Sequence, residues 1–232
     1  MEIRDHVRSI ERSRDALQKI DRQTTFSLHN REWDMLPGVF SPICSPTTGV
    51  AMELLGLDDP EMMPRSGSFL EIGCGAGLIA VSSALAGCDR VVASDINSVA
   101  VGNTALNAHR HGVEDRVRVL RSDLFSALDP HERFDTIFWS SNYVLAPADY
   151  EYQSVHERAY VDAGYATHRR FLAEARRWLT PTGSIVLHFS DRGDLSGLMR
   201  IAGECGHGLR ALRSSSFREG GQDVRHMLVE VI

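Results

Sequence analysis

Three glycines, Gly73, Gly75 and Gly77, lie between an apolar run and a helix-like segment in FLEIGCGAGLIAV, residues 69–81. Glycine tolerates a positive φ angle, and its missing Cβ lets a ligand approach the backbone closely. A strand that turns at such glycines into a helix predicts a ligand-binding turn at the carboxyl end of that strand. The alternative is a turn that serves only packing.

Strand-like and helix-like segments alternate from Ser68 onward, which predicts a parallel sheet with helices on both faces. Seven strands are expected, at residues 68–74, 90–95, 116–124, 133–141, 184–190, 209–217 and 225–232. No helical pattern separates the last two, so they should form a C-terminal antiparallel hairpin at one sheet edge. The expected fold class is therefore α/β and Rossmann-like, with a seven-stranded, mostly parallel sheet.

The N-terminal part of the chain lacks this alternation. Apolar residues recur at helical spacing, so about the first 30 residues are expected to be helical. Prolines interrupt the next segment, and a second helix is expected at about 48–55, closed by Pro60 and Pro64. We therefore expect an N-terminal helical extension or lid, residues 1–60, followed by a ligand-binding domain, residues 61–232.

Composition limits the partners that such a chain can have. Its 232 residues include 25 basic and 31 acidic ones, and no basic tract is present to neutralise phosphates, so no nucleic-acid partner is expected. No apolar run is long enough for a membrane span or a signal peptide, so we expect a cytoplasmic protein without a membrane partner. The four cysteines are scattered, and neither a disulfide framework nor a metal site is expected.

Two carboxylates follow successive strands beyond the glycine turn. Asp95 ends the second expected strand, where a carboxylate can accept hydrogen bonds from both hydroxyls of a ribose. Asp123 ends the third expected strand. Either residue alone would more often cap a helix. Because both lie with the glycine turn at the carboxyl edge of the sheet, together they predict a crevice for a nucleoside-containing cofactor.

The spacing of the glycines separates two classes of cofactor. A dinucleotide fingerprint needs a third glycine in G-x-G-x-x-G, and Leu78 occupies that position. The pattern here is G-x-G-x-G preceded by Glu71, which is typical of enzymes that bind S-adenosylmethionine. A carboxylate beside the turn suits that ligand, because it is cationic and has no pyrophosphate.

The span from about Val39 to the C-terminus resembles the class I S-adenosylmethionine-dependent methyltransferases, most of all the release-factor glutamine methyltransferases and their small-molecule relatives. The matching pieces are GVFSPICSPTTGVAMELL, FLEIGCGAG, ASDIN, SDLF, FDTIFWSSNYV and FLAEARRWLTPTGSIVLHFS. The resemblance implies an enzyme that uses S-adenosyl-L-methionine and no metal. It also implies a set of cofactor-binding residues: Glu71, Gly73, Gly75 and Gly77 at the methionine end, Asp95 and Ile96 at the ribose and adenine, Asp123 and Leu124 at the adenine amino group, and either Thr47 or Thr48.

One departure from that family bears on the acceptor. The glutamine methyltransferases carry Asn-Pro-Pro-Tyr after the fourth strand, where this sequence has Ser140, Ser141, Asn142 and Tyr143. Because serine replaces the asparagine that holds the amide nitrogen in that family, we expect a small-molecule acceptor. The resemblance to the family implies methylation at nitrogen. Ser140, Asn142 and Tyr143 are the candidate catalytic residues. The alternatives are a protein side-chain (glutamine-type) methyltransferase, an O-methyltransferase, and a non-catalytic cofactor-binding subunit.

Residues 143–168 contain all five tyrosines of the chain in a stretch without regular periodicity. A long irregular segment in a compact domain is usually functional. The tyrosines either form the wall of a substrate pocket or anchor a loop. In this segment, we expect His156 and His168 to lie at the surface or at the start of a helix rather than to act as catalytic bases. His188, inside an expected strand, is expected to be buried and hydrogen-bonded.

Overall fold

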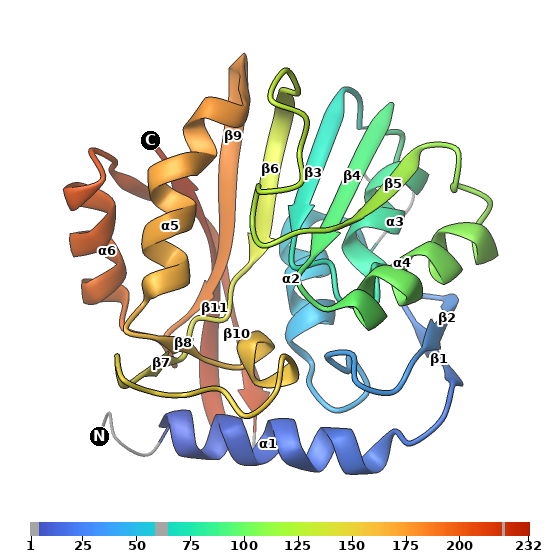
Figure 1. Ribbon diagram of the computed structural model, residues 1–232, viewed down its shortest axis with the longest axis horizontal. Helices are drawn as coiled ribbons and strands as arrows, with labels where there is room; N and C mark the ends of the chain where they lie inside the picture. Colours follow the sequence, from blue (N-terminus) through green and yellow to red (C-terminus); the bar gives the residue numbers. More distant parts are fainter. Residues whose placement is uncertain (1–4, 59–64, 220) are drawn as a thin grey trace.

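The computed structural model describes residues 5–58, 65–219 and 221–232, and a seven-stranded sheet forms its centre (Figure 1). Its strands are β3 (Ser68–Ile72), β4 (Arg90–Asp95), β5 (Val117–Arg121), β6 (Phe134–Ser140), β9 (Leu179–Ser190), β10 (Leu209–Glu219) and β11 (Gln222–Val231). Their order is β10-β11-β9-β6-β3-β4-β5. The strands from β9 to β5 are parallel, and β11 is antiparallel to both β9 and β10. The predicted fold class and its C-terminal hairpin are confirmed.

Both faces of this sheet are covered by the helices α2 (Thr47–Leu55), α3 (Leu78–Leu85), α4 (Ser98–Arg110), α5 (Ala166–Glu174) and α6 (Leu195–Glu204), and α1 (Asp5–Lys19) lies at its edge (Figure 1). The chain also forms the short 3₁₀ turns η2 (His156–Ala159) and η3 (Ala175–Trp178). Helices α2, α3 and α4 pack in one apolar cluster, and α5 and α6 in another. Central strands such as β4 are therefore buried on both sides, as parallel strands are when helices cover both faces. In the described ranges, no helix has both the length and the apolar character that a membrane crossing requires.

The N-terminal segment differs from the expected continuous helix. Helix α1 ends at Lys19, and an antiparallel hairpin follows, made of β1 (Thr24–Leu28) and β2 (Arg31–Met35). His29 and Asn30 join the strands with φ angles of 49° and 57°, the left-handed conformation that a tight two-residue hairpin turn requires. The second expected helix is present as α2. Pro60, Pro64 and the expected domain boundary between residues 60 and 61 lie outside the described residues.

A buried polar junction fastens the hairpin to the rest of the fold. Asn107 on α4 accepts a hydrogen bond from the backbone N–H of Asp34 at 2.8 Å. Its amide nitrogen donates to the carbonyl oxygens of Asp34 at 2.9 Å and Ala76 at 2.8 Å. Asn107 therefore ties β2 directly to the glycine turn between β3 and α3.

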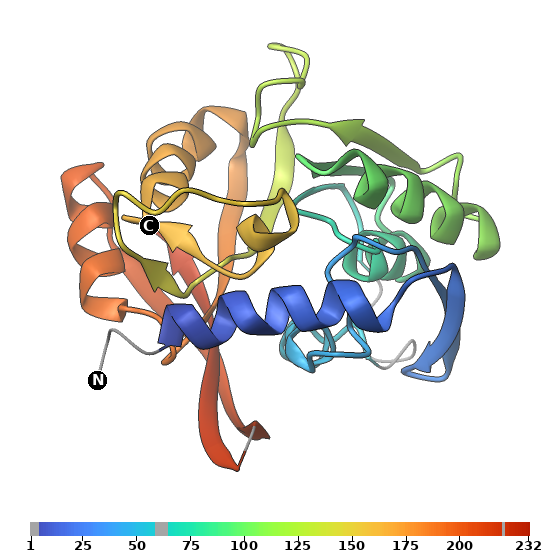
Figure 2. The ribbon, with the colours of Figure 1, turned by 60° about the horizontal axis from the view of Figure 1, so that its bottom comes forward.

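Helix α1 lies across the carboxyl edge of the parallel strands, over η2 and the strands β7 (Leu145–Ala146) and β8 (Asp162–Ala163) (Figures 1 and 2). Figure 2 also shows the β10–β11 hairpin projecting beyond the body of the sheet. The carboxyl edge is the place where ligands bind in open α/β sheets. In this protein that edge is covered by α1, the loop before α2, and η2.

Candidate active site

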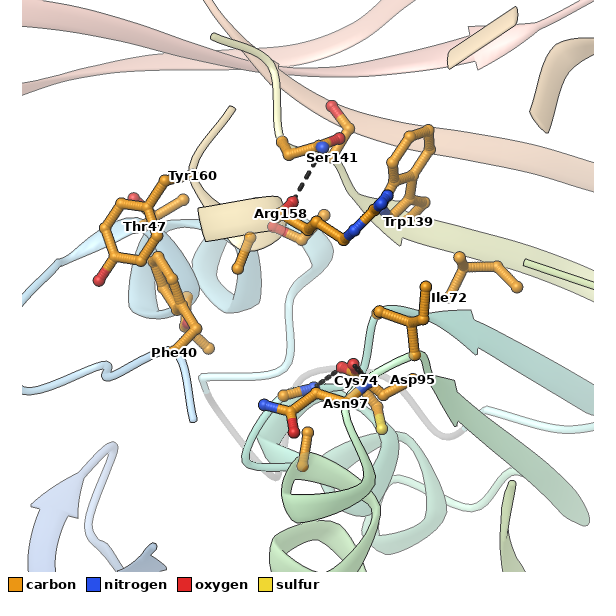
Figure 3. Close-up of a pocket in the computed structure, with 18 of the residues that line it drawn as sticks. Phe40, Thr47, Ile72, Cys74, Asp95, Asn97, Trp139, Ser141, Arg158 and Tyr160 are labelled. Carbon is orange, nitrogen blue, oxygen red and sulfur yellow. Dashed lines mark hydrogen bonds between the residues drawn. The ribbon is translucent and has the colours of Figure 1, made fainter. Parts of the chain in front are cut away.

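A cavity lies between the carboxyl edge of the sheet and the N-terminal segment (Figure 3). Of the site residues predicted from the sequence, those that line it are Thr48, Glu71, Gly73, Gly75, Asp95, Ile96, Asp123, Leu124, Ser140, Asn142 and Tyr143. Thr47 lines it as well, so the structure does not separate the two threonines. Gly77 is the one predicted residue that is not part of the lining.

The glycine turn combines two structural requirements. Gly75 has a φ of 56°, and a Cβ added there would meet no atom within 4 Å. Gly77 has a φ of 84°, but a Cβ added there would lie 2.7 Å from the side chain and 2.9 Å from the Cα of Thr104. Gly75 therefore leaves open space beside the turn, whereas Gly77 allows α4 to approach it.

Asp95 at the end of β4 holds this turn in place. One carboxylate oxygen accepts a hydrogen bond from the N–H of Gly75 at 2.9 Å, and the other accepts from the N–H of Asn97 at 2.8 Å. Burial raises the pKa of Asp95, while the backbone hydrogen bonds from Asn97, Gly75 and Ile96 act in the opposite direction. The result is a fixed hydrogen-bond acceptor at the cavity wall.

Glu71 on β3 is 2% exposed, and its Oε2 has no hydrogen-bond partner within the described part of the chain. Burial raises the pKa of Glu71 well above its ordinary value, a backbone hydrogen bond from Ala80 lowers it, and the nearby charge of Asp95 raises it further. A buried polar atom without a partner is costly. A cationic or hydrogen-bond-donating ligand group in the cavity would relieve that cost.

The third strand contributes Asp123 and Leu124 to the cavity. The carboxylate of Asp123 is half exposed and forms an ion pair with Arg170 at 3.0 Å. Leu124 is buried and has a φ of 51°, a left-handed conformation that is uncommon for leucine. This turn conformation places both residues at the cavity wall.

Asn142 lies at the opposite end of the cavity, just after β6. Its amide nitrogen donates to the carbonyl oxygens of Arg158 at 2.9 Å and Val161 at 3.0 Å. Because both partners are acceptors, the nitrogen must face them and Oδ1 must face elsewhere. Oδ1 is buried and has no partner among the described residues. A residue that lines this end of the cavity therefore carries an unused acceptor of hydrogen bonds among the described residues.

Ser140, at the end of β6, has partners that sequence reasoning missed. Its Oγ lies 3.1 Å from Nδ1 of His188 on β9, and Nε2 of His188 lies 3.0 Å from Nδ1 of His226 on β11. Both histidines are fully buried. His188 is thus buried and hydrogen-bonded, as expected from its place in a strand. His226 had no recognisable signal, because only the order of the strands brings it here.

The tyrosine-rich segment both lines the cavity and anchors a loop. Tyr143 and Tyr160 line the cavity, and the ring of Tyr160 lies 5.0 Å from that of Phe40. Tyr165 instead donates to the carbonyl oxygen of Tyr143 at 2.6 Å, and Tyr150 donates to a carboxylate oxygen of Glu157 at 2.9 Å. The two interpretations of this segment therefore apply to different tyrosines.

His156 and His168 each lie in the first turn of a helix, η2 and α5, which is one of the two positions expected, but both are buried and not at the surface. His156 on η2 lies 2.7 Å from Oγ of Ser13 on α1, measured to Nδ1. His168 pairs through Nδ1 with the buried Asp162 at 2.7 Å. Each imidazole thus has a structural partner, and His156 joins the N-terminal helix to the cavity roof.

Other cavity residues were also not found from the sequence. They come from α1, the proline-containing loop, β6 and η2: Ser9, Arg12, Phe40, Pro42, Trp139 and Arg158. In Figure 3, Asp95, Asn97 and Cys74 lie together at one end, and Ser141, Arg158 and Trp139 lie at the other. The sequence FSP, which includes Phe40 and Pro42, indicates an ordered loop before the core. Such a loop has to pack against the rest of the domain, and this could have pointed to the cavity.

Comparisons with known proteins agree with this geometry. The family model for ribosomal protein L11 methyltransferase (PrmA) matches residues 45–147. The chain is 31% identical over 148 residues to a ribosomal protein uL3 glutamine methyltransferase of Burkholderia pseudomallei, covering 58% of this chain and 47% of that protein. It is 30% identical over 171 residues to a release factor glutamine methyltransferase of Agrobacterium fabrum, covering 68% and 58%. The chain thus spans about half the length of these curated relatives.

Among solved structures, a 16S rRNA N2 methyltransferase of Thermus thermophilus in complex with AdoMet and guanosine superimposes with a TM-score of 0.62. The sequence identity is 21%, and the match covers 90% of this chain and 49% of that one, so the likeness concerns the fold. Fold and core sequence together are similar to those of the class I S-adenosylmethionine-dependent methyltransferases. The class and the cofactor predicted from the motifs are confirmed. Within the class, the chain is similar to the glutamine methyltransferases of ribosomal protein uL3 and of release factors.

The small-molecule partner expected from the sequence is wrong. The relatives that match over the cofactor-binding core are named for protein substrates. The expectation rested on the replacement of an amide-bearing residue by Ser140. The structure shows why that replacement is a weak argument: Asn142, two residues further on, brings a side-chain amide to the same cavity.

Proposed function

We propose that this protein transfers a methyl group from S-adenosylmethionine to a nitrogen of a protein side chain, of the glutamine type. The observation that carries the proposal is a single cavity that joins the glycine turn and Asp95 to the unpaired amide oxygen of Asn142. When bound, the cofactor supplies a methyl group on a sulfonium, an electrophile with a very good leaving group. The chain has to align the acceptor with that methyl group and exclude water.

The residues at the first end of the cavity fit this cofactor. The open face of Gly75 leaves room for the ligand chain, and the unpaired Oε2 of Glu71 offers a partner to its ammonium group. We assign the ribose hydroxyls to Asp95 and the adenine to Ile96, Asp123 and Leu124. The remaining proposed contacts are Gly73 and Thr48, while Gly77 acts through packing.

The residues at the second end fit an acceptor that carries N–H groups. An oxygen such as Asn142 Oδ1 accepts hydrogen bonds and cannot donate them, so it favours an amide or amine over a carbonyl. Tyr143 lines the same cavity, and the centroid of its ring lies 6.2 Å from that of His188 in an edge-to-face arrangement. The glutamine methyltransferases to which the chain is similar support a side-chain amide as the acceptor. We therefore assign Ser140, Asn142 and Tyr143 to the acceptor end of the cavity as the proposed catalytic residues.

The N-terminal segment, residues 1–60 as predicted, is proposed to act as a lid. Its described part covers the cavity through α1 and the loop that carries Phe40. Ser13 fastens α1 to His156, and Asn97 fastens the loop to the cofactor end. A lid of this kind excludes water from the transfer step.

The experiment has a binding part and a transfer part. Calorimetry with S-adenosylhomocysteine should show binding, and Asp95→Ala should weaken it by about 1–3 kcal/mol because polar groups lose their partner. Asp89→Ala is the matched control: Asp89 also accepts from a glycine N–H, that of Gly67 at 2.7 Å, but it does not line the cavity. No binding by the parent at high micromolar concentration would rule out the proposal.

The transfer part uses purified ribosomal protein uL3, ribosomal protein L11 and a release factor as acceptors, with isotopically labelled S-adenosylmethionine. Peptide mass spectrometry then locates the methyl group. We expect label on a side-chain nitrogen of one of these proteins. Binding of S-adenosylhomocysteine without transfer to any of them would contradict the proposed acceptor and favour a cofactor-binding subunit.

A further inference from the structure

A line of three side chains leads from the cavity into the interior of the sheet. Strands β6, β9 and β11 are neighbours in the sheet order, and each contributes one residue: Ser140, His188 and His226. Ser140 lines the cavity, and its Oγ lies 3.1 Å from His188 Nδ1. His188 Nε2 lies 3.0 Å from His226 Nδ1, and the two imidazole rings are nearly parallel, at 10°. Both rings are 0% exposed.

The protons in this line are coupled to one another. Burial, and then the neighbouring His226, lower the pKa of His188 to about 3, so the His188 ring is neutral and carries one N–H. If His188 donates from Nε2 to His226, its Nδ1 must accept the proton of Ser140. Oγ of Ser140 can then accept another proton from the cavity. If instead His226 donates to Nε2 of His188, then Nδ1 of His188 donates to Oγ of Ser140, and Ser140 donates its own proton into the cavity.

We propose that Ser140, His188 and His226 form a proton relay, which takes up the proton that the acceptor nitrogen loses on methylation. This inference rests on the proposed function. The nitrogen forms its bond to the methyl carbon while the carbon–sulfur bond breaks, leaving a neutral thioether. The nitrogen's proton passes to Oγ of Ser140, the Ser140 proton passes to Nδ1 of His188, and the Nε2 proton of His188 passes to Nδ1 of His226. His226, which is 0% exposed, ends with one additional proton; this proton returns through His188 and Ser140 to the cavity after the product has left.

The neutral state of His188 suits this role. A ring that gains a proton at Nδ1 as it loses one at Nε2 never carries a net charge, so burial does not oppose the transfer through it. Aromatic rings surround the pair: the centroid of Tyr143 lies 6.2 Å from each imidazole, and that of Phe217 lies 6.1 Å from His226. Ser140 is the group in contact with the acceptor, and the two histidines act through it.

The first test compares Ser140→Ala and His226→Phe with the parent in single-turnover transfer to the acceptor identified above. Proton transfer by a positioned side chain is worth about 10²–10⁴-fold, so we expect the rate to fall at least about 100-fold. The KM for the acceptor and the affinity for S-adenosylhomocysteine should change less than about threefold. His207→Phe is the matched control, because His207 is a partly buried histidine, hydrogen-bonded at 3.0 Å to Leu172, that does not line the cavity.

The second test separates a relay from a structural anchor. In mixtures of H₂O and D₂O, the transfer rate of the parent plotted against the fraction of D₂O should give a curve, because more than one proton moves in the same step. In His226→Phe the same plot should be linear. His226→Gln keeps an oxygen that accepts from His188 but cannot take up a proton. We expect the same loss of rate in His226→Gln, with stability close to that of the parent.

The outcomes distinguish this inference from the proposed function. If the parent transfers methyl groups and Ser140→Ala or His226→Gln does so at the parental rate, the relay is wrong and the proposed function stands. If the parent binds S-adenosylhomocysteine but methylates none of the protein acceptors, the proposed function fails and the relay fails with it.

Discussion

Asn97 donates a hydrogen bond from its side-chain amide to the carbonyl oxygen of Gly38 at 2.8 Å. The oxygen of the same amide accepts from the N–H of Val99 at 3.0 Å and thereby caps α4. Its backbone N–H is bound to the carboxylate of Asp95. One residue thus connects the cofactor end of the cavity to the N-terminal loop that covers it.

The substitution Asn97→Asp separates the two functions of this side chain. A carboxylate retains the cap and suits the helix N-terminus, but it cannot donate to Gly38. We expect faster amide hydrogen exchange in residues 36–46 and weaker binding of S-adenosylhomocysteine, with a change of less than about 1 kcal/mol in the free energy of unfolding. Asn97→Ala, which also removes the cap, should destabilise the fold by about 1 kcal/mol more. Unchanged exchange in the loop of Asn97→Asp would show that the contact with Gly38 is unimportant.

Alanine substitutions at Gly75 and Gly77 should have different effects. Both positions have a positive φ angle, so each substitution costs about 1 kcal/mol of backbone strain. At Gly77 the new methyl group also collides with Thr104, which adds about 1–3 kcal/mol. Gly77→Ala should therefore lower the melting temperature more, and Gly75→Ala should mainly lower the affinity for S-adenosylhomocysteine. Differential scanning calorimetry and titration calorimetry measure the two quantities, and equal losses in both variants would contradict the assignment.

His188 makes stability depend on pH. Its pKa falls from 6.5 to about 3 on folding, so below pH 6.5 the unfolded chain binds a proton that the native protein does not. The free energy of unfolding should therefore decrease as the pH falls from 6.5 toward 3, by up to about 1.4 kcal/mol per pH unit from this residue. Urea unfolding at pH 6.5 and 5.5 should show a smaller decrease in His188→Gln than in the parent. The carboxylates and the other histidines are common to both proteins, and equal decreases would show that His188 is protonated in the native state.

Ser13 fixes α1 over the cavity. Nε2 of His156 lies 3.3 Å from the carbonyl oxygen of Val39 and must donate to it, so Nδ1 accepts the Ser13 proton. Ser13→Ala leaves that buried nitrogen unsatisfied and should cost about 1–3 kcal/mol in urea unfolding. Hydrogen exchange in α1 should accelerate. Ser27→Ala, at an exposed position on β1, is the control and should change neither quantity.

Much of the central sheet could be predicted from the sequence because its signals are local. The runs around Leu70, Val92 and Ile137 are short and apolar, and each is followed by a turn or a helix pattern. The predicted cofactor residues lie at the ends of these strands, so predicting the strands also placed the residues. Gly77 shows the limit, because only the position of Thr104 on another helix reveals that this glycine serves packing.

The β1–β2 hairpin and the histidine line could not be predicted in the same way. The apolar spacing of α1 continues to Ile20, and the turn at His29 and Asn30 has no glycine to mark it. Ser140, His188 and His226 are separated by 48 and 38 positions in the chain. Ser140 meets His188 because β6 pairs with β9, and His226 meets His188 because β11 lies between β9 and β10. Such contacts depend on tertiary topology, which periodicity does not encode.

The position of β11 beside β9 means that the two ends of the cavity depend on different kinds of contact. Strands β3, β4 and β5 are joined by nearby helices, so the cofactor end of the cavity is assembled from contacts that are short in sequence. The wall that contains His226 needs β6, β9 and β11 in register, and contacts between distant parts of a chain form slowly. We therefore expect the cofactor end of the cavity to form earlier in folding than the wall that contains His226.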